Sequence, residues 1–440
     1  MNRLLPVGPL LSGALAVVTC AAVALTPAPA LAAGTSTGHR AEPDSLVQVT
    51  ARVETPPVFD DEAGGNGDAD DPAIWVNRRD RSRSVVIGTV KNAGLQVFDL
   101  RGRLVQTVAP PAAPAADDEP GRFNNVDIVP GFRLGARRVD LAVVSDRGRD
   151  QIRAYAIDAR TGRLSDVTAA DVPLAFSADQ TQVNDQQTVY GLTTYVDPDG
   201  TAYAVGTRRH TPQIGLFRLV AEHGRVSYRR VDTADFPTSF RLRDGRSWSP
   251  CEDPGEGPQL EGLVVDEANH TLYAAQEDVA LWRLKLGRGR FGTEPRIVER
   301  TQEFGVPAAY DPKTEECAVT GADPGYGGRI AADVEGLTIY ATGRRSGTLL
   351  VSSQGDNTFY TYDRRTLAPL RHFAVVDGRR TDGSSDCDGA DTVSTPLPGY
   401  PHGLLVVQDG DNTPDVVDGD GEPRTVTDFK FVSAQVLRHR

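Results

Sequence analysis

A pattern of two short β-strands recurs six times along this chain of 440 residues, and this repetition constrains the fold more than any other feature. The first strand of each pair is an apolar run that ends on a polar side chain. These runs end at Thr89, Ser145, Thr207, Gln276, Ser353 and Gln408. A second strand with a central aromatic residue follows in at least five copies, and a further strand precedes each pair. Period-2 patterning and frequent turn residues indicate strands rather than helices.

The repeat predicts an all-β protein, and specifically a six-bladed β-propeller domain spanning residues 45–440. Successive runs end 55 to 77 residues apart, which is long enough for one small sheet per repeat. A single β-sandwich is excluded because it needs only about 100 residues. The segment Ser45–Glu54 alternates polar and apolar residues. We predict that it forms an N-terminal strand that completes the last blade, closes the ring and so removes a free sheet edge.

Residues 1–32 are typical of a secretory signal peptide. Arg3 supplies positive charge, the apolar run Leu10–Leu25 is short for a membrane span, and Ala30–Ala32 is a small-residue cleavage site. We therefore expect a secreted, extracellular protein that is cleaved near Ala32, with a flexible leader at residues 33–44 and no membrane segment. The net charge of −13 argues against nucleic acid as a partner, and we expect a monomer.

Three cysteines remain after cleavage of the signal peptide, namely Cys251, Cys317 and Cys387. Cys251 and Cys317 both lie in proline- and glycine-rich stretches that are typical of loops. In an oxidising compartment we expect these two to form a disulfide, and the alternative is three free thiols. Cys387 lies among acidic residues, where we assign it no chemical role.

Polar residues flank the same two strands in every repeat. Asp70, Glu261 and Glu335 lie close to the start of the strand before a pair, whereas Lys91 and Arg147 follow an apolar run. The start of one strand and the end of its antiparallel neighbour share a sheet edge, so these side chains converge on one mouth of the central channel. Oxygen-rich sets suit hard divalent cations, whereas scattered histidines do not suit zinc. Each set taken alone also fits a solvated turn or a surface ion pair, but recurrence at one edge in all six repeats favours a site.

Nine motifs in order along the chain resemble the β-propeller phytases. They are Asp68–Val76 (DADDPAIWV), Asn124–Ile128 (NNVDI), Val189–Gly191 (VYG), Gln259–Gly262 (QLEG), Glu277–Asp278 (ED), Asp333–Tyr340 (DVEGLTIY), Ser352–Gly355 (SSQG), Thr381–Gly389 (TDGSSDCDG) and Val407–Gly410 (VQDG). The resemblance runs from about Glu54 to Val436. It implies a secreted, calcium-dependent enzyme of the 3-phytase type that hydrolyses phytate (myo-inositol hexakisphosphate) or calcium–phytate, releasing inorganic phosphate and lower inositol phosphates.

The resemblance also implies roles for individual residues. Several Ca²⁺ ions are expected on Glu54, Asp70, Asp71, Glu261, Glu277, Asp333, Glu335, Gln354, Asp382 and Asp388. Substrate phosphate is expected on Lys91, Arg147, Tyr190 and Arg208, and the catalytic set is Lys91, Arg147, Glu261 and Glu335. The chain departs from the family pattern at two positions. Asn92 stands where a second lysine is expected, and Arg208 replaces a lysine.

Two other functions are compatible with a carboxylate-rich propeller mouth. One is a calcium-dependent lactonase or other esterase, and the other is a calcium-stabilised binding propeller without enzymatic activity. Neither explains cations placed among the carboxylates, whereas a phosphate-rich substrate needs them. Lys91 and Arg147 therefore favour phosphate monoester hydrolysis.

Overall fold

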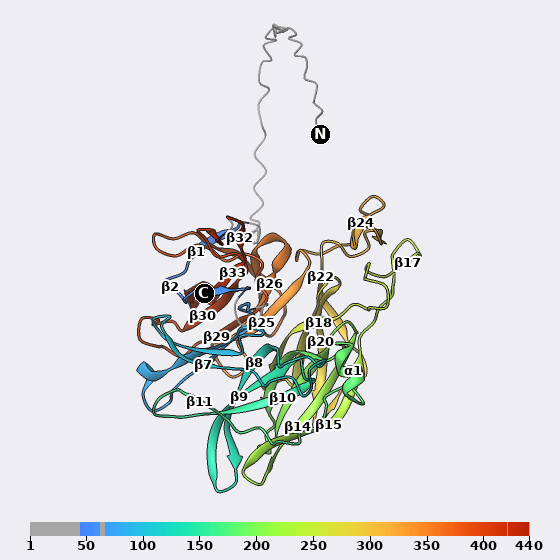
Figure 1. Cartoon of the computed structure of the whole chain (residues 1–440). Helices are drawn as coiled ribbons and strands as arrows, with labels where there is room; N and C mark the ends of the chain where they lie inside the picture. Colours follow the sequence, from blue (N-terminus) through green and yellow to red (C-terminus); the bar gives the residue numbers. More distant parts are fainter. Residues whose placement is uncertain (1–44, 62–66, 420, 440) are drawn as a thin grey trace, which may run out of the picture. The chain divides into compact units, whose positions relative to one another are not determined.

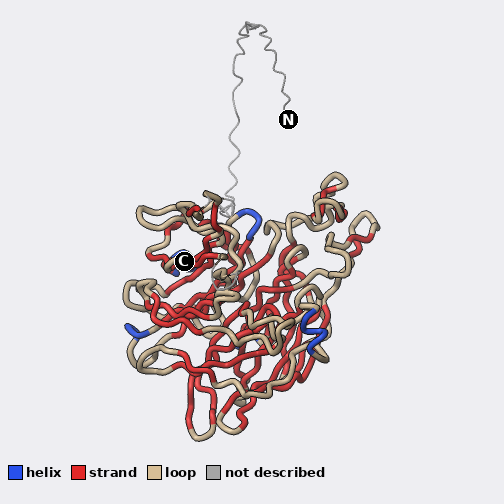
Figure 2. The backbone as a smooth tube through the Cα atoms, viewed as in Figure 1, coloured by secondary structure: helices blue, strands red, loops and turns tan. Residues whose placement is uncertain are grey.

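The computed structural model describes residues 45–61, 67–419 and 421–439, so the predicted signal peptide and leader lie outside the described residues. Six sheets form a propeller, and strands dominate the regular structure (Figure 1; Figure 2). The innermost strands contact one another in cyclic order, and the last meets the first. They are β4 (Pro72–Trp75), β8 (Phe123–Leu134), β12 (Val189–Val196), β18 (Leu260–Asp266), β25 (Val334–Ala341) and β29 (Ala390–Val393). The prediction of an all-β, six-bladed propeller is confirmed.

Each blade continues outward through three antiparallel strands. The second strands are the predicted apolar runs: β5 (Val85–Thr89), β9 (Arg137–Asp146), β13 (Ala202–Arg208), β19 (Thr271–Gln276), β26 (Gly347–Ser353) and β30 (Leu404–Asp409). The third strands carry the predicted aromatic residues: β6 (Leu95–Asp99), β10 (Gln151–Ile157), β14 (Gln213–Glu222), β20 (Ala280–Gly287), β27 (Thr358–Asp363) and β33 (Val426–Ser433). The outermost strands are β7 (Leu104–Val108), β11 (Leu164–Asp166), β15 (Arg225–Asp235), β22 (Arg296–Arg300), β28 (Pro369–Val376) and β2 (Val53–Glu54).

The apolar runs are continuous because both faces of a blade are covered by neighbouring blades. All five residues of β5 are buried. Val86 packs into a cluster shared with the sixth blade, whereas its neighbour Ile87 packs into a cluster shared with the second. Each fully buried side chain of this size contributes roughly 1.5–3 kcal/mol. The outermost strands lack this burial, as in β7, where no residue is fully buried, and this explains why the sequence pattern does not mark them.

The N-terminal segment forms two strands rather than the single predicted one. β1 (Val47–Thr50) pairs in parallel with β28 of the fifth blade, and β2 pairs antiparallel with β33 of the sixth. Between them the backbone carbonyl of Ala51 accepts a hydrogen bond from Thr381, at 3.1 Å. The chain therefore passes from one blade to the next within a few residues. The closing role of this segment stays a prediction.

One long stretch of the chain holds strands that we did not expect, one of them in the fourth blade and two outside the blades. Residues 287–328 look irregular in sequence, yet they contain β22 and the hairpin of β23 (Ala308–Asp311) and β24 (Glu316–Val319). The predicted Cys251–Cys317 disulfide is confirmed, and it links β24 to the loop after β17 (Ser247–Trp248) (Figure 1). Within the described residues no helix is long and apolar enough to cross a membrane.

Candidate active site

The starts of the innermost strands and the ends of the second strands share one edge of each sheet. Phe123 pairs with Asp146, Val189 with Arg208, and Val334 with Ser353. The polar residues just beyond these pairs therefore lie around one mouth of the channel, and we call this set of residues the rim. It holds most of the predicted site residues, namely Asp70, Lys91, Arg147, Tyr190, Glu261, Glu277, Asp333, Glu335, Gln354 and Asp388.

Four innermost strands carry a β-bulge at the same position, and a rim residue is the first member of each. The bulges place Asn124, Tyr190, Glu261 and Glu335, each with the residue that follows, opposite a single residue of the second strand. Bulges re-aim side chains and are common beside active sites. In two blades the polar residue that ends the run satisfies the bulge backbone, because the hydroxyl of Thr207 accepts a hydrogen bond from the N–H of Gly191 at 2.8 Å and that of Ser145 accepts one from the N–H of Asn125 at 3.0 Å.

Glycine follows three of these bulge residues because the next blade approaches there. A Cβ atom on Gly191 would lie 2.0 Å from the carbonyl oxygen of Glu261, and one on Gly262 would lie 2.0 Å from that of Glu335. No other residue fits without moving the neighbouring blade. The recurring Tyr-Gly and Glu-Gly pairs are therefore bulges rather than turns, and they bring the rim side chains of successive blades together.

Glu261, Glu277 and Glu335 form the centre of the rim. They are buried, and one oxygen atom of each lies within 4.8 Å of one oxygen of the others. Oε1 of Glu277 and Oε2 of Glu335 are buried without a hydrogen-bond partner. Burial, followed by repulsion between the carboxylates, raises the pKa of Glu277 and Glu335 well above the ordinary value. Unsatisfied carboxylate oxygens at this spacing fit a hard divalent cation.

Lys91 lies beside these glutamates among aspartates of two blades. Its ammonium donates to Asp68 and lies 3.6 Å from Oδ2 of Asp70 and 3.7 Å from Oδ2 of Asp388. Burial alone would lower the pKa of Lys91, but the three aspartates reverse this and raise it. Lys91 has a φ of 45°, in the left-handed region that is strained for a non-glycine residue. Such strain is common at functional sites.

Gln354 and Asp388 join this group from the fifth and sixth blades. Nε2 of Gln354, in the 3₁₀ turn η3 (Gln354–Asp356), donates to Oδ1 of Asp388 at 2.7 Å. Burial raises the pKa of Asp388 to about 7 although Lys91 opposes the shift. Asp333, next to β25, is similarly affected, and burial followed by repulsion from Glu261 raises its pKa to about 6. Four of the six blades thus contribute acidic groups to the rim.

Arg147 connects to the glutamates through Asn124. Nη1 of Arg147 donates to Oδ1 of Asn124 at 2.9 Å, and Nδ2 of Asn124 donates to Oε1 of Glu261 at 2.5 Å. The guanidinium lies 5.5 Å from the centroid of the Tyr190 ring. Tyr190 also hydrogen-bonds Glu261, and burial followed by this carboxylate raises the pKa of its phenol well above the usual range. The phenol therefore stays protonated.

Comparison with known proteins assigns the chain to a family. The family model described as Phytase matches residues 14–233 and 256–437. The chain belongs to the phytase family. A 3-phytase from Bacillus subtilis (strain 168) is 30% identical to this enzyme over 418 residues, which cover 93% of this chain and 90% of that protein.

Two solved structures match this chain at lower sequence identity. Chaetomium thermophilum Sqt1 is 12% identical with a TM-score of 0.41, over 87% of this chain and 99% of that one. The periplasmic gluconolactonase PpgL of Pseudomonas aeruginosa is 13% identical with a TM-score of 0.37, over 68% of this chain and 69% of that one. Family membership rests on the sequence matches.

Two arginines that the sequence analysis missed lie beside Arg147 in this phytase. Arg122 is its cross-strand neighbour, since the N–H of Arg147 donates to the carbonyl of Arg122 at 2.8 Å. Nη1 of Arg122 donates to Oδ1 of Asn92 at 3.2 Å, so this guanidinium reaches the residue that stands where a second lysine is expected. Burial and repulsion from Arg147 lower the pKa of Arg122 to about 10. Arg122 could have been predicted from the sequence by its position directly before the innermost strand β8, where the other blades also carry polar residues.

Arg209 is the second missed arginine. Its backbone N–H donates to the carbonyl of Thr188 at 2.9 Å, and the hydroxyl of Thr188 donates to the carbonyl of Arg147 at 2.5 Å. Burial followed by repulsion from Arg147 lowers the pKa of Arg209. The predicted Arg208 instead donates through Nε to the carbonyl of Gln187 at 2.9 Å. Within the described residues, none of Arg122, Arg147 and Arg209 forms a salt bridge with a carboxylate.

Three further predicted metal ligands have partners of their own. Oδ2 of Asp71 accepts a hydrogen bond from the backbone N–H of Val126 at 3.0 Å, which joins the first two blades. Glu54 and Asp382 contact the ammonium group of Lys430. Cys387 is a buried free thiol, and burial raises its pKa, so that it stays protonated and unreactive.

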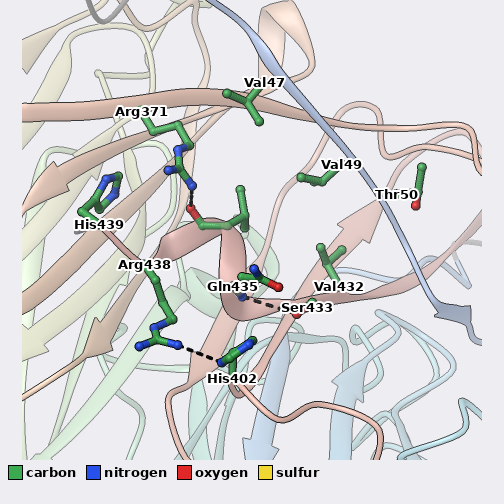
Figure 3. Close-up of a pocket in the computed structure, with 11 residues that line it drawn as sticks. Val47, Val49, Thr50, Arg371, His402, Val432, Ser433, Gln435, Arg438 and His439 are labelled. Carbon is green, nitrogen blue, oxygen red and sulfur yellow. Dashed lines mark hydrogen bonds between the residues drawn. The ribbon is translucent and has the colours of Figure 1, made fainter. Parts of the chain in front are cut away.

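A separate open groove of about 850 Å³ lies between β1 and the C-terminal turn η4 (Ala434–Leu437) (Figure 3). Arg371, His402, Arg438 and His439 line it, and none of its lining residues is a carboxylate. It also contains no predicted site residue. The groove therefore offers no carboxylate ligands for a metal ion.

Proposed function

We propose that this chain hydrolyses the phosphate monoesters of phytate in a calcium-dependent reaction, releasing inorganic phosphate and lower inositol phosphates. The proposal rests on a cluster of carboxylates that lies next to an arginine. Glu261, Glu277 and Glu335 leave carboxylate oxygens unsatisfied, and Arg147 lies beside them without a carboxylate partner. A metal-binding set next to free guanidinium groups suits a polyanionic phosphate ester. Family membership supports the same reaction.

Calcium is the proposed metal because the ligands are carboxylate and amide oxygens. Asp70, Glu261, Glu277, Asp333, Glu335, Gln354 and Asp388 are the proposed ligands at the rim. When bound there, calcium would offset the charge of the phosphate and lower the pKa of a coordinated water.

The protein's own residues bind and orient the substrate. Lys91 and Arg147 are proposed to hold phosphate oxygens, and the planar guanidinium of Arg147 can donate two parallel hydrogen bonds to one phosphate. Asn124 and the protonated Tyr190 fix the Glu261 carboxylate by hydrogen bonds, so that it stays aimed into the rim. These groups are preorganised before substrate arrives, which is how electrostatic stabilisation of a transition state becomes effective.

The direct test is phosphate release from phytate by the purified chain in calcium, compared with hydrolysis of a simple lactone. We expect phosphate release and no lactone hydrolysis. Lactone hydrolysis without phosphate release would instead support an esterase, and inactivity toward both would support a binding protein. Secretion is part of the proposal, and the Cys251–Cys317 disulfide supports it because disulfides persist in oxidising compartments.

Arg122 is predicted to supply the cation that Asn92 lacks. Arg122→Ala should lower kcat/KM for phytate about tenfold, which corresponds to roughly 1.4 kcal/mol of binding to the transition state. Adding Asn92→Lys to that variant should restore most of the loss, because the two side chains meet at 3.2 Å. The matched control is Arg229→Ala, whose side chain is exposed. Wild-type kinetics in Arg122→Ala would remove this residue from the substrate site.

The effect of calcium on stability should increase with pH. Burial raises the pKa of Asp333 to about 6 and that of Asp388 to about 7, so between about pH 4 and 7 the metal-free folded state binds more protons than the unfolded state. Its free energy of unfolding should therefore fall as pH rises through this window. Calcium needs ionised ligands and binds more tightly as pH rises.

The corresponding measurement is the melting temperature at pH 5 and pH 8, with excess calcium and with chelator. We expect the calcium-dependent increase to be clearly larger at pH 8. We also expect an activity optimum near neutral pH, with most activity lost by about pH 4. An optimum near pH 3, or an equal calcium effect at both pH values, would contradict the proposed ligands.

A further inference from the structure

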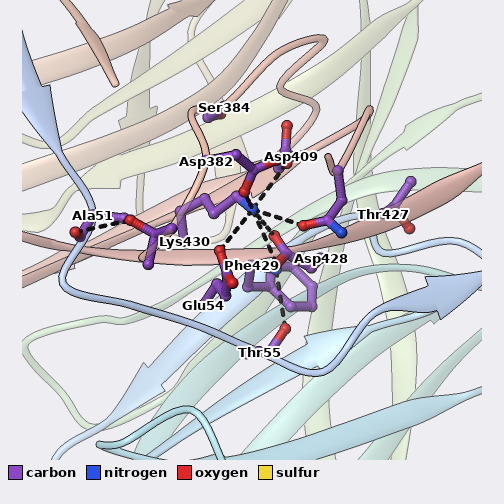
Figure 4. Close-up of polar contacts among 12 residues, drawn as sticks. Ala51, Glu54, Thr55, Asp382, Ser384, Asp409, Thr427, Asp428, Phe429 and Lys430 are labelled. Carbon is purple, nitrogen blue, oxygen red and sulfur yellow. Dashed lines mark hydrogen bonds and ion pairs between the residues drawn. The ribbon is translucent and has the colours of Figure 1, made fainter. Parts of the chain in front are cut away.

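Lys430, on β33, is fully buried at the junction between the N-terminal segment and the sixth blade. Its ammonium group lies within a cage of acidic side chains (Figure 4). Oxygens of Asp409 and Asp428 lie 3.1 Å and 3.0 Å from Nζ, and Oε2 of Glu54 lies 3.4 Å away. Asp382 also forms an ion pair with it. One nitrogen atom is thus the common partner of four carboxylates.

The cage unites parts of the chain that are far apart in sequence. Glu54 comes from β2, Asp409 from the end of β30 and Asp428 from β33. Oδ1 of Asn412 completes the group at 2.9 Å from Nζ. Six oxygen atoms surround the ammonium when both oxygens of Asp428 are counted. Calcium ions in proteins bind about six to eight oxygen ligands, so the cage has enough oxygens for one.

We propose that Lys430 is a permanent internal cation that takes the place of a divalent metal ion in this cage. Glu54 and Asp382 then act as partners of the ammonium rather than as calcium ligands. A calcium ion cannot share the centre of the cage with Nζ, because two cations at that separation repel each other strongly. The attachment of β2 to the sixth blade is accordingly independent of calcium, in contrast to the rim.

The physical role of the ammonium is to compensate charge that the fold has buried. Without it, four carboxylates would face one another across a site where Asp409, Asp428 and Asp382 are almost inaccessible to solvent. Breaking a buried ion pair by removing one partner is strongly destabilising, because the other charge stays uncompensated. Lys430 should therefore contribute to stability in the complete absence of metal.

The first arm of the test removes the cation. Lys430→Met should lower the melting temperature in excess chelator by about 5 °C or more. The matched control is Lys285→Met, because Lys285 is exposed on β20 and should leave the melting temperature unchanged. A melting temperature for Lys430→Met in chelator that equals the wild-type value would overturn the proposal.

The second arm tests the displacement of calcium and stays informative if Lys430→Met does not fold. Glu54→Gln should lower the melting temperature equally in calcium and in chelator, so that the calcium-dependent increase keeps its wild-type size. Glu294→Gln, at an exposed position, is the control. A smaller calcium-dependent increase in Glu54→Gln would show that Glu54 binds calcium and would overturn the proposal. Both arms measure thermal stability, so neither depends on the proposed hydrolysis of phytate.

Discussion

Excess chelator is expected to abolish phytate hydrolysis and to lower the melting temperature by several degrees. The rim gathers carboxylates from four blades, and two of them, Glu277 and Glu335, have a buried oxygen without a partner. Their mutual repulsion opposes folding when no cation is present. A ligand that binds only the folded state at about 100 times its dissociation constant adds about 2.7 kcal/mol of stability per site.

The measurement is a calcium titration followed by thermal melting and by phosphate release on the same samples. Calcium added back after chelation should restore both properties, and the two titration curves should share a midpoint if one set of ions serves both. Full activity in excess chelator would eliminate the metal mechanism. Loss of activity without any change in melting temperature would instead indicate calcium bound through the substrate alone.

Replacing one rim carboxylate should separate metal binding from substrate binding. Glu335→Gln keeps the volume of the side chain but removes its charge, so the variant should lose about 100-fold in kcat/KM and part of the calcium-dependent thermal shift. Arg147→Ala should lose at least about tenfold in kcat/KM, roughly 1.4 kcal/mol, while its calcium-dependent shift stays near wild type. Arg147 contacts Asn124 rather than a metal-binding oxygen, which is the reason for the difference.

Glu294→Gln and Arg229→Ala are the matched controls, because both side chains are exposed and neither takes part in the contacts described for the site. Wild-type kinetics in Arg147→Ala would make Arg147 a structural residue and would move the substrate site elsewhere. An unchanged calcium shift in Glu335→Gln would remove Glu335 from the ligand set.

The sequence alone determined the number of blades, the three inner strands of each blade and the edge at which the polar residues gather. The reason is that neighbouring blades cover both faces of a strand such as β5, which turns the strand into a continuous apolar run. The polar residue at the end of a run is also visible in the sequence, and in two blades, at Ser145 and Thr207, it satisfies the backbone of a bulge. The outermost strands escape this reasoning because they are partly exposed and carry no distinctive pattern, as in β7.

Only the tertiary structure decided which polar residues meet. Asn124 and Glu261 are 137 positions apart, and they hydrogen-bond because two bulges in different blades aim them at one point. Arg122 belongs to no sequence motif, and it joins the site because it lies next to Arg147 on the neighbouring strand. Lys430 is the clearest example of a contact that the sequence does not predict. Nothing in the sequence near Lys430 indicates that Glu54, 376 positions away, lies against its ammonium group. Contacts of this range depend on how the blades pack around the channel, and local sequence patterns carry no record of that packing.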